Sequence, residues 1–290
     1  MDMAATSLPL LALTAALAWH ADTHAACPSH ERVNAILRLA YYAKEPVRGL
    51  PGNLSMQDAE CGRRRLVERL ESVENRIVGY KAGLTNAELQ QRFGVASPVR
   101  GVLLEKMLLP DGAAVAAAFG ARPVFEADLI VVVKDAAIHE ARTHLEVLKS
   151  LSLVVPFIEL PDLLVAEGEP LTGSLITMLN VGARLGVVGK GVAVQPTAAF
   201  AGALANMHVV TLDETGKELA RGPGTAILGH PLNAVIWLAE DLRRSRIRLK
   251  SGDMLSLGAF SPPLQPKPGL AVTVRYLGLP GEPSVGVRFR

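Results

Sequence analysis

The chain has 290 residues, of which 49% are hydrophobic and 20% are charged, and 30 basic against 28 acidic side chains give a formal charge of +2. These numbers exclude a disordered chain and a polytopic membrane protein, and the length fits one large domain at least as well as two. Basic side chains are scattered except in Arg63–Arg65 and Arg243–Lys250. We therefore expect no nucleic-acid partner, and we interpret the first cluster as the solvated face of a helix.

The first 25 residues have the pattern of a secretory signal. Leu8–Trp19 is apolar over 12 residues, too short to span a bilayer but the right length for a signal core, and Thr23–Ala25 offers small residues before a cut. Met1–Met3 departs from the pattern because it has no Lys or Arg. The prediction is a cleaved segment 1–25 and an exported, periplasmic protein outside the membrane, or a cytoplasmic one if the segment is kept.

Two cysteines, Cys27 and Cys61, would survive that cleavage. An oxidising compartment could join them as one disulfide, whereas a reducing one would leave two free buried thiols. The sequence leaves both alternatives open.

Helical spacing of apolar residues marks Glu31–Ala43, and a second helical stretch runs from about Gln57 to Glu74. Arg76–Leu84 then has the composition of a short strand, which places Lys81 near the end of that strand. The Thr and Glu of Thr85–Glu88 have the spacing of a capping box and predict the start of another helix.

Short β-rich runs dominate beyond Gly94, and two helices interrupt them, Ile138–Leu151 and Pro231–Arg244. Asp213–Gly216 predicts a hairpin turn. The predicted strands lie in Val124–Val133, Val154–Leu160, Leu185–Val192, Met207–Leu212, Met254–Leu257 and Leu270–Tyr276.

Together, the predicted helices and strands indicate an α+β fold, in which a mixed, mostly antiparallel β core follows N-terminal helices. We expect residues 26–290 to form a single catalytic domain, with a helical part at 26–95 and a β-rich, metal-binding core at 96–290.

Acidic residues interrupt two runs that are otherwise suited to burial. Glu126 and Asp128 lie two apart in Phe125–Leu129, so strand periodicity points both to the same face, and Glu159 repeats the anomaly in Val154–Leu160. Buried carboxylates repel one another and need a compensating cation, either basic side chains or a metal ion. Three oxygen ligands without His or Cys suit Mg²⁺ or Mn²⁺ rather than zinc. The spacing of these acids leaves a structural alternative open, in which they lie on the solvent-exposed face of edge strands or form salt bridges.

A set of motifs then points to a family. Gly79–Thr85 resembles the G-x-K-x-G-L-T segment of 2-keto-4-pentenoate hydratases and oxalocrotonate decarboxylases, which belong to the fumarylacetoacetate hydrolase superfamily. Further matches follow in the family's order between Glu31 and the carboxyl terminus. They are Gly101–Met107 on G-V-L-x-x-x-M, Glu126–Asp128 on E-A-E, Ile158–Asp162 on L-E-V-x-D, Leu228–Ala239 on L-G-H-P-L-N-A-V-x-W-L-A, and Leu249–Asp253 on L-K-x-G-D.

The resemblance implies a role for each matching residue. It implies a fumarylacetoacetase C-terminal-like fold, with Glu126, Asp128 and Glu159 as ligands of Mg²⁺ or Mn²⁺ and Lys81 as the catalytic residue beside the substrate. The predicted substrate-binding residues are Leu84, His230 and Ser261. The resemblance also implies a homo-oligomer that takes a small 2-oxo acid in aromatic catabolism.

Three departures from the family pattern lie near the predicted site. Asp128 stands where the family has Glu, which keeps the charge but shortens the reach by one methylene. Gly258–Ser261 stands in place of G-S-L-T, so a hydroxyl is missing at Ala259. Asn180–Arg184 replaces N-A-S-S-A-R and loses two serines. These departures therefore affect the predicted substrate more than the predicted reaction class.

The expected activity is that of a hydratase, a carbon-oxygen lyase that converts a 2-hydroxy-2,4-dienoate into a 4-hydroxy-2-oxo acid. Metal-stabilised enolate chemistry would serve decarboxylation of a 2-oxo-enedioate equally well. A third alternative is an exported, non-catalytic ligand-binding relative. Two roles are open for His230. It lies at the start of a predicted helix, so it could cap that helix, or its imidazole could take part in catalysis.

Overall fold

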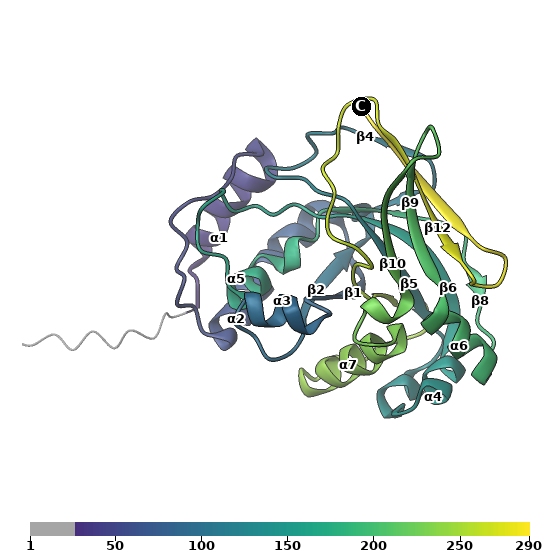
Figure 1. The fold of residues 1–290 in the computed structure, drawn as a ribbon. Coiled ribbons are helices and arrows are strands. Elements are labelled where there is room, and N and C mark those ends of the chain that lie inside the picture. The colour runs from purple at the N-terminus through teal and green to yellow at the C-terminus, as the bar shows by residue number, and fades with distance from the viewer. Residues whose placement is uncertain (1–26) are drawn as a thin grey trace, which may run out of the picture.

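The computed structural model describes residues 27–290, so the predicted signal segment 1–25 lies outside the described residues. Figure 1 shows the early helices gathered at one side of two β-sheets, with three later helices, α4, α6 and α7, below the sheets. No helix within residues 27–290 is long and apolar enough to cross a membrane.

Both predicted N-terminal helices are present. Helix α1 spans His30–Ile36 and continues as the π-helical turn Leu37–Ala43, and α2 spans Met56–Glu74. Ser55 caps α2 because its hydroxyl accepts a hydrogen bond from the Asp58 amide at 3.1 Å. The remaining α-helices are α3 Ala87–Arg92, α4 His144–Lys149, α5 Gly173–Met178, α6 Ala198–Asn206 and α7 Pro231–Arg244.

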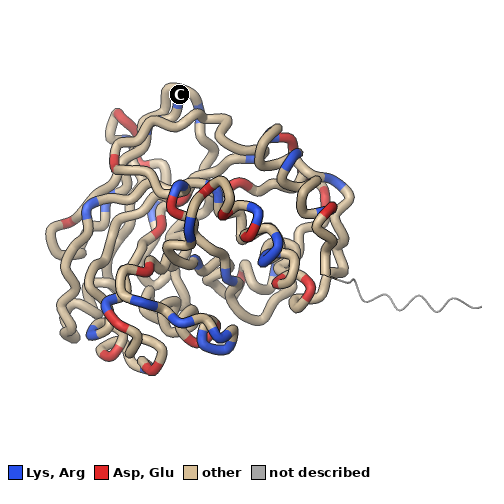
Figure 2. The backbone as a smooth tube through the Cα atoms, turned by 180° about the vertical axis from the view of Figure 1, so that it is seen from behind, with Lys and Arg blue, Asp and Glu red and all other residues tan. Residues whose placement is uncertain are grey.

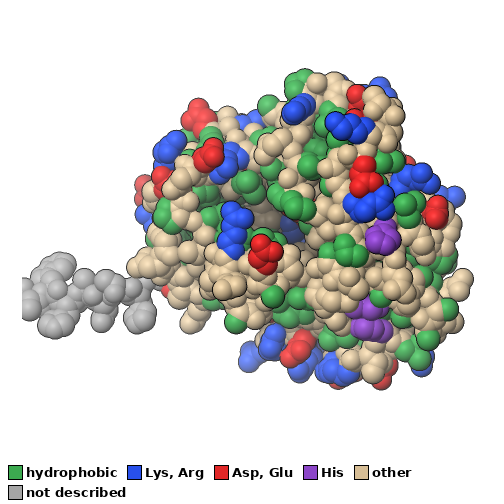
Figure 3. Space-filling view, in the orientation of Figure 1, with side chains coloured by type: hydrophobic (Ala, Val, Ile, Leu, Met, Phe, Trp, Pro, Cys, Tyr) green, Lys and Arg blue, Asp and Glu red, His purple; other side chains and the backbone are tan. Residues whose placement is uncertain are grey.

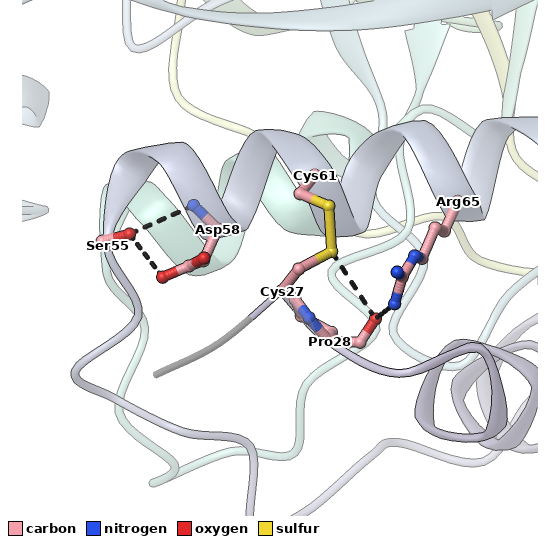
Figure 4. Close-up of a disulfide and its surroundings, with 6 residues drawn as sticks. All are labelled: Cys27, Pro28, Ser55, Asp58, Cys61 and Arg65. Atoms are coloured by element: carbon pink, nitrogen blue, oxygen red, sulfur yellow. Dashed lines mark hydrogen bonds between the residues drawn. A yellow bond between two sulfur atoms is a disulfide. The ribbon is translucent and has the colours of Figure 1, made fainter. Parts of the chain in front are cut away.

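A disulfide between Cys27 and Cys61 ties the start of the described chain to α2 (Figure 4). Next to it, Arg65 donates to the Pro28 carbonyl at 2.7 Å. Of the two alternatives that the sequence leaves open for these cysteines, the structure has the bonded one.

The strands form an eight-stranded sheet and a five-stranded sheet. The larger sheet has the order β2-β1-β11-β5-β6-β7-β3, and β8 pairs with β6; the smaller has the order β10-β9-β12-β13-β4. The strands of the larger sheet are β1 Ile77–Gly83, β2 Val99–Leu104, β3 Leu108–Pro110, β5 Glu126–Val133, β6 Leu151–Leu160, β7 Leu185–Val188, β8 Val192–Ala193 and β11 Met254–Ser256. Those of the smaller sheet are β4 Ala113–Val115, β9 His208–Asp213, β10 Glu218–Pro223, β12 Ala271–Leu277 and β13 Ser284–Phe289.

Most strand pairs are antiparallel, and β1 with β11, β3 with β7 and β4 with β13 are the parallel ones among the described strands. The main core includes Leu129 and Ile158 from the larger sheet, Val274 from the smaller sheet and Leu238 from α7. The prediction of an α+β fold with a mixed, mostly antiparallel core is confirmed.

One predicted helix is wrong. Instead of a helix over Ile138–Leu151, a 3₁₀ turn at Ala136–Glu140 is followed by the short helix α4, and Leu151 already belongs to β6. Thr143 explains the break, because it forms a capping box with Glu146 and so restarts the helix. Pairing of Leu151 with Val133 then draws the next residues into the sheet.

Two local predictions also differ from the structure. Asn86, rather than Thr85, caps α3, and Thr85 is buried. Within the triplet that we interpreted as a solvated helix face, Arg63 is only 3% exposed and donates to the Arg100 carbonyl. Burial and the neighbouring Arg100 lower the pKa of Arg63 to about 10. Elsewhere basic and acidic residues are interspersed along the surface helices (Figure 2).

Replacing Cys61 with Ser should lower the free energy of unfolding by about 2–4 kcal/mol, because the disulfide closes a loop between residues 34 apart in sequence. Urea unfolding of the oxidised proteins, followed by circular dichroism, measures the difference. Reductant should bring the wild type to the stability of the variant and leave the variant unchanged. Equal stabilities of the two oxidised proteins would contradict the prediction.

Candidate active site

The centre of the site is a pair of acidic residues on adjacent strands. Glu126 of β5 and Glu159 of β6 are register partners, so their side chains leave the same face of the sheet directly opposite each other. Asp128 lies two residues along β5 and therefore on that face as well, where its register partner is Phe157. The strand periodicity that pointed Glu126 and Asp128 to one face is confirmed.

Lys81 reaches this face from β1. Its ammonium contacts the carboxylate of Glu159 and donates to the Val181 carbonyl at 3.0 Å. Lys81 and Glu159 are each 3% exposed, so the ion pair is buried. Gly101 makes room for the lysine stem, since a Cβ there would lie 2.8 Å from Lys81 Cγ. The structure thus brings together Lys81 and Glu159, which lie 78 positions apart in the chain.

A left-handed turn presents the Val181 carbonyl to this lysine. Asn180, Val181 and Gly182 have φ values of 55°, 54° and 65°. A β-branched residue in that region stores about 1–3 kcal/mol of strain, which surrounding contacts must offset. The Asn180 side chain supplies them by accepting from the Val102 amide at 2.8 Å and donating to the Val102 carbonyl at 2.9 Å. This turn replaces the serine-containing segment of the family.

Asp128 is held differently from the two glutamates. Its Oδ2 accepts from the Ser256 hydroxyl at 2.6 Å, and its Oδ1 accepts from the Gly258 amide at 2.9 Å and the Leu257 amide at 3.2 Å. It is fully buried. Within residues 27–290, no three His, Cys, Asp or Glu side chains are grouped so that they could hold one ion. The assignment of all three carboxylates as direct ligands stays a prediction.

Burial and mutual repulsion make these carboxylates unusually weak acids. Loss of water around the carboxyl, followed by the charge of Glu159, raises the pKa of Glu126 to about 8. The same two causes raise the pKa of Asp128 to about 7, although the Ser256 hydrogen bond acts in the opposite direction. Lys81 offsets part of the negative charge. The cluster therefore favours a further positive charge, which can be a proton or a metal cation.

Leu84 and Ser261 lie where chain segments leave the sheet. Leu84 follows β1 directly, is half-buried, and has a φ of 56°. Ser261 is half-buried and follows Phe260, whose amide donates to the Ala127 carbonyl at 3.0 Å. This hydrogen bond places the segment before Ser261 beside Glu126. Figure 3 shows that one face of the molecule is hollowed near its middle. Substrate contact by Leu84 and Ser261 stays a prediction.

His230 caps helix α7. Its Nδ1 accepts from the Leu232 amide at 3.0 Å, its Nε2 lies 3.1 Å from the Ala201 carbonyl, and its ring stacks on that of His144. Burial and the neighbouring His144 lower the pKa of His230, so the neutral form is favoured. Both ring nitrogens are engaged, and of the two roles considered from sequence the structure shows the cap. Contact between His230 and a substrate stays a prediction.

Sequence reasoning missed two residues that shape the site. Ser256 is the register partner of Lys81 and binds Asp128, but a serine in a short β-run carries no distinguishing signal. Tyr276 of β12 places its buried hydroxyl between β5 and β6, where it accepts from the Phe157 amide at 3.1 Å and donates to the Asp128 carbonyl. The alternation of β12 marks Tyr276 as a core residue but does not indicate a polar partner.

Comparisons with known proteins show what the chain is similar to. No family model matches the chain. The chain is 30% identical over 225 residues to a 2-keto-4-pentenoate hydratase of Paraburkholderia xenovorans, a match that covers 77% of this chain and 81% of the relative. It is 28% identical over 245 residues to a 4-oxalocrotonate decarboxylase of Pseudomonas putida, covering 81% and 86% of the two chains.

A solved structure is similar over nearly the whole chain. It is 4-oxalocrotonate decarboxylase from Pseudomonas putida G7, complexed with magnesium and adipate, with a TM-score of 0.77 and 27% sequence identity. The match covers 90% of this chain and 95% of that one.

Without divalent cations, the wild type should lose stability as the pH rises from about 5 to about 8.5, and Glu126→Gln should lose less. The folded state holds a proton on Glu126 up to about pH 8, whereas the ordinary value is 4.5, so the unfolded chain releases that proton first and unfolding becomes easier between these values. Urea unfolding in chelator at several pH values measures the slope. The variant and the wild type should be close at low pH, and a difference independent of pH would contradict the prediction.

Proposed function

We propose that this chain, which belongs to the 2-keto-4-pentenoate hydratase family, is a divalent-metal-dependent hydratase that adds water to a 2-hydroxy-2,4-dienoate and yields a 4-hydroxy-2-oxo acid. The observation that carries the proposal is the pair of half-buried Glu126 and buried Glu159, with the buried Lys81 against Glu159. A charge cluster of this kind on a buried sheet face has no structural need that apolar residues would not meet better.

Glu126 and Glu159 suit a hard divalent cation. Their carboxylates are oxygen donors on register partners, and the raised pKa of Glu126 indicates a site where positive charge is stabilising. The similar decarboxylase structure contains magnesium, which supports Mg²⁺ or the chemically close Mn²⁺. When bound, the ion would supply Lewis-acid stabilisation of the enolate form of a chelating 2-oxo acid.

Lys81 is the residue proposed to handle protons. Its ammonium is buried and held by Glu159 and the Val181 carbonyl, so it lies beside one of the proposed metal ligands. In the proposed reaction the 2-hydroxyl loses its proton and C5 gains one, which gives an α,β-unsaturated ketone. Water then adds its oxygen to C4 and its proton to C3. Lys81 donates to the C2 oxygen or relays one of these protons.

Decarboxylation is the second candidate, and the likeness to two 4-oxalocrotonate decarboxylases favours it. Loss of CO₂ from a 2-oxo-enedioate leaves an electron pair that the same enolate-stabilising site can accept. Self-association and a place in aromatic catabolism belong to the proposal through the family resemblance.

Purified protein with Mg²⁺ or Mn²⁺ should consume 2-hydroxypenta-2,4-dienoate, seen as loss of its ultraviolet absorbance, and chelator should abolish the activity. Glu159→Gln should lower kcat by about a hundredfold or more, the scale on which electrostatic stabilisation of the enolate contributes. Release of CO₂ from a 2-oxo-enedioate under the same conditions identifies the decarboxylase alternative.

A matched control is Glu218→Gln, because Glu218 is an exposed residue of β10 in an ion pair with Arg221 and should leave kcat unchanged. Turnover of neither substrate class, together with tight metal and ligand binding, would instead identify a non-catalytic binding relative. Full activity of the Glu159 variant would refute the ligand assignment.

We also propose that the protein is exported. The signal-like pattern of residues 1–25 supports this, and so does the Cys27–Cys61 disulfide, because such bonds persist in oxidising compartments. Expression of the full chain in a Gram-negative host should yield periplasmic protein whose amino terminus follows Ala25, as determined by terminal sequencing. Protein in the cytoplasmic fraction with Met1 at its terminus would remove the proposal. A variant with Leu11→Arg in the apolar segment should stay in the cytoplasm.

A further inference from the structure

We propose that Asp128 is a positioning residue and not a direct metal ligand: its carboxylate anchors Ser256–Gly258 against β5, while Glu126 and Glu159 hold the ion. The ion itself rests on the proposed function above. The anchoring of the segment stands on the described hydrogen bonds alone.

The hydrogen bonds of Asp128 occupy both oxygens of its carboxylate. Ser256 donates to Oδ2 at 2.6 Å, and the amides of Leu257 and Gly258 donate to Oδ1 at 3.2 and 2.9 Å. The Leu129 amide donates to Oδ1 as well. Four donors thus converge on this carboxylate and fix its position against Ser256–Gly258.

Moving this carboxylate toward an ion would leave buried groups without partners. Asp128 and Ser256 are both 0% exposed, so water cannot replace the lost hydrogen bonds. The backbone is fixed as well, because Tyr276 donates to the Asp128 carbonyl from the other sheet. Glu126 lies at the partly exposed start of β5 and makes no such set of bonds among the described residues. The two acids of this strand therefore have different roles.

The shorter side chain fits the same conclusion. Asp128 stands where the family has Glu, and with this shorter side chain its carboxylate accepts from the amides of Leu257 and Gly258. No three acidic side chains of residues 27–290 are grouped to hold one ion together, although Glu126 and Glu159 are register partners.

The anchored segment, Ser256–Gly258, continues along the chain to Ser261, which is a predicted substrate-binding residue. After Ser256 it follows β5, with the Leu257 amide donating to the Leu129 carbonyl at 3.0 Å. Gly258, at a φ of 111°, lies so close to the end of β1 that a Cβ would be 2.3 Å from Thr85 Oγ1. The segment then reaches Ser261. Asp128 thus fixes the path of the residues that lie beside Glu126.

Mn²⁺ binding to the full chain, measured by electron paramagnetic resonance, separates the two roles. Glu126→Gln and Glu159→Gln should each weaken binding by about a hundredfold or more, whereas Asp128→Asn, which keeps the size and an acceptor oxygen, should weaken it by at most about tenfold, the lower end of effects from residues outside the coordination shell. Equal losses in all three variants would overturn the proposal. So would a Mn²⁺-loaded crystal structure with an Asp128 oxygen at coordination distance.

Hydrogen exchange of the metal-free protein tests the anchor independently of any ion. Asp128→Ala should speed exchange of the Gly258 amide by at least about tenfold relative to wild type, whereas the Leu257 amide, which also donates to the Leu129 carbonyl, should stay protected. Asp128→Asn and Glu126→Gln should leave both amides protected. Unchanged protection of the Gly258 amide in Asp128→Ala would overturn the anchoring role. A wild type that binds no Mn²⁺ would overturn the proposed ion site and hence the proposed function, and the exchange result would still decide the role of Asp128.

Discussion

The register of β5 with β6 places two acids, Glu126 and Glu159, opposite each other on a sheet face that is largely removed from water. Like charges at this spacing destabilise the fold unless a cation lies between or beside them. Lys81 supplies one positive charge, and the weak acidity of Glu126 shows that the demand for positive charge is not fully met. The rest of the site is organised around this repulsion.

Several otherwise costly features serve to hold Lys81 in place. The absence of a side chain at Gly101 leaves space for its stem, and the strained turn at Val181 turns a carbonyl toward its ammonium. Asn180 fixes that turn by a paired hydrogen bond to the neighbouring strand. Strain at Val181 and a buried ion pair each oppose folding, so their occurrence at one place indicates that the position of Lys81 matters more than local stability.

Sequence periodicity predicted the parts of the site that depend on a single strand. The spacing of Glu126 and Asp128 gave their common face, and the flanking apolar runs gave both strands. The contacts between distant segments could not be read in this way. Asn180 and Tyr276 act through partners on other elements, and no local pattern marks a residue in the left-handed region when it is Val181 and not glycine. The error at Ile138–Leu151 has two origins: the capping box of Thr143 and Glu146, a local signal, breaks the predicted helix, and pairing with β5 draws only its last residue, Leu151, into the sheet.

The departures from the family pattern are not scattered through the site. Asp128 accepts a hydrogen bond from the amide of Gly258, the first residue of the altered segment Gly258–Ser261. The turn at Asn180–Gly182 contacts Lys81 through the Val181 carbonyl. Lys81, Glu126 and Glu159 are kept. Loss of catalysis would leave no selection for a buried, self-repelling charge cluster, since a pure binding site could replace it with neutral groups at a gain in stability. The departures from the family pattern therefore lie around Lys81, Glu126 and Glu159, and these three residues keep the groups that the proposed reaction uses.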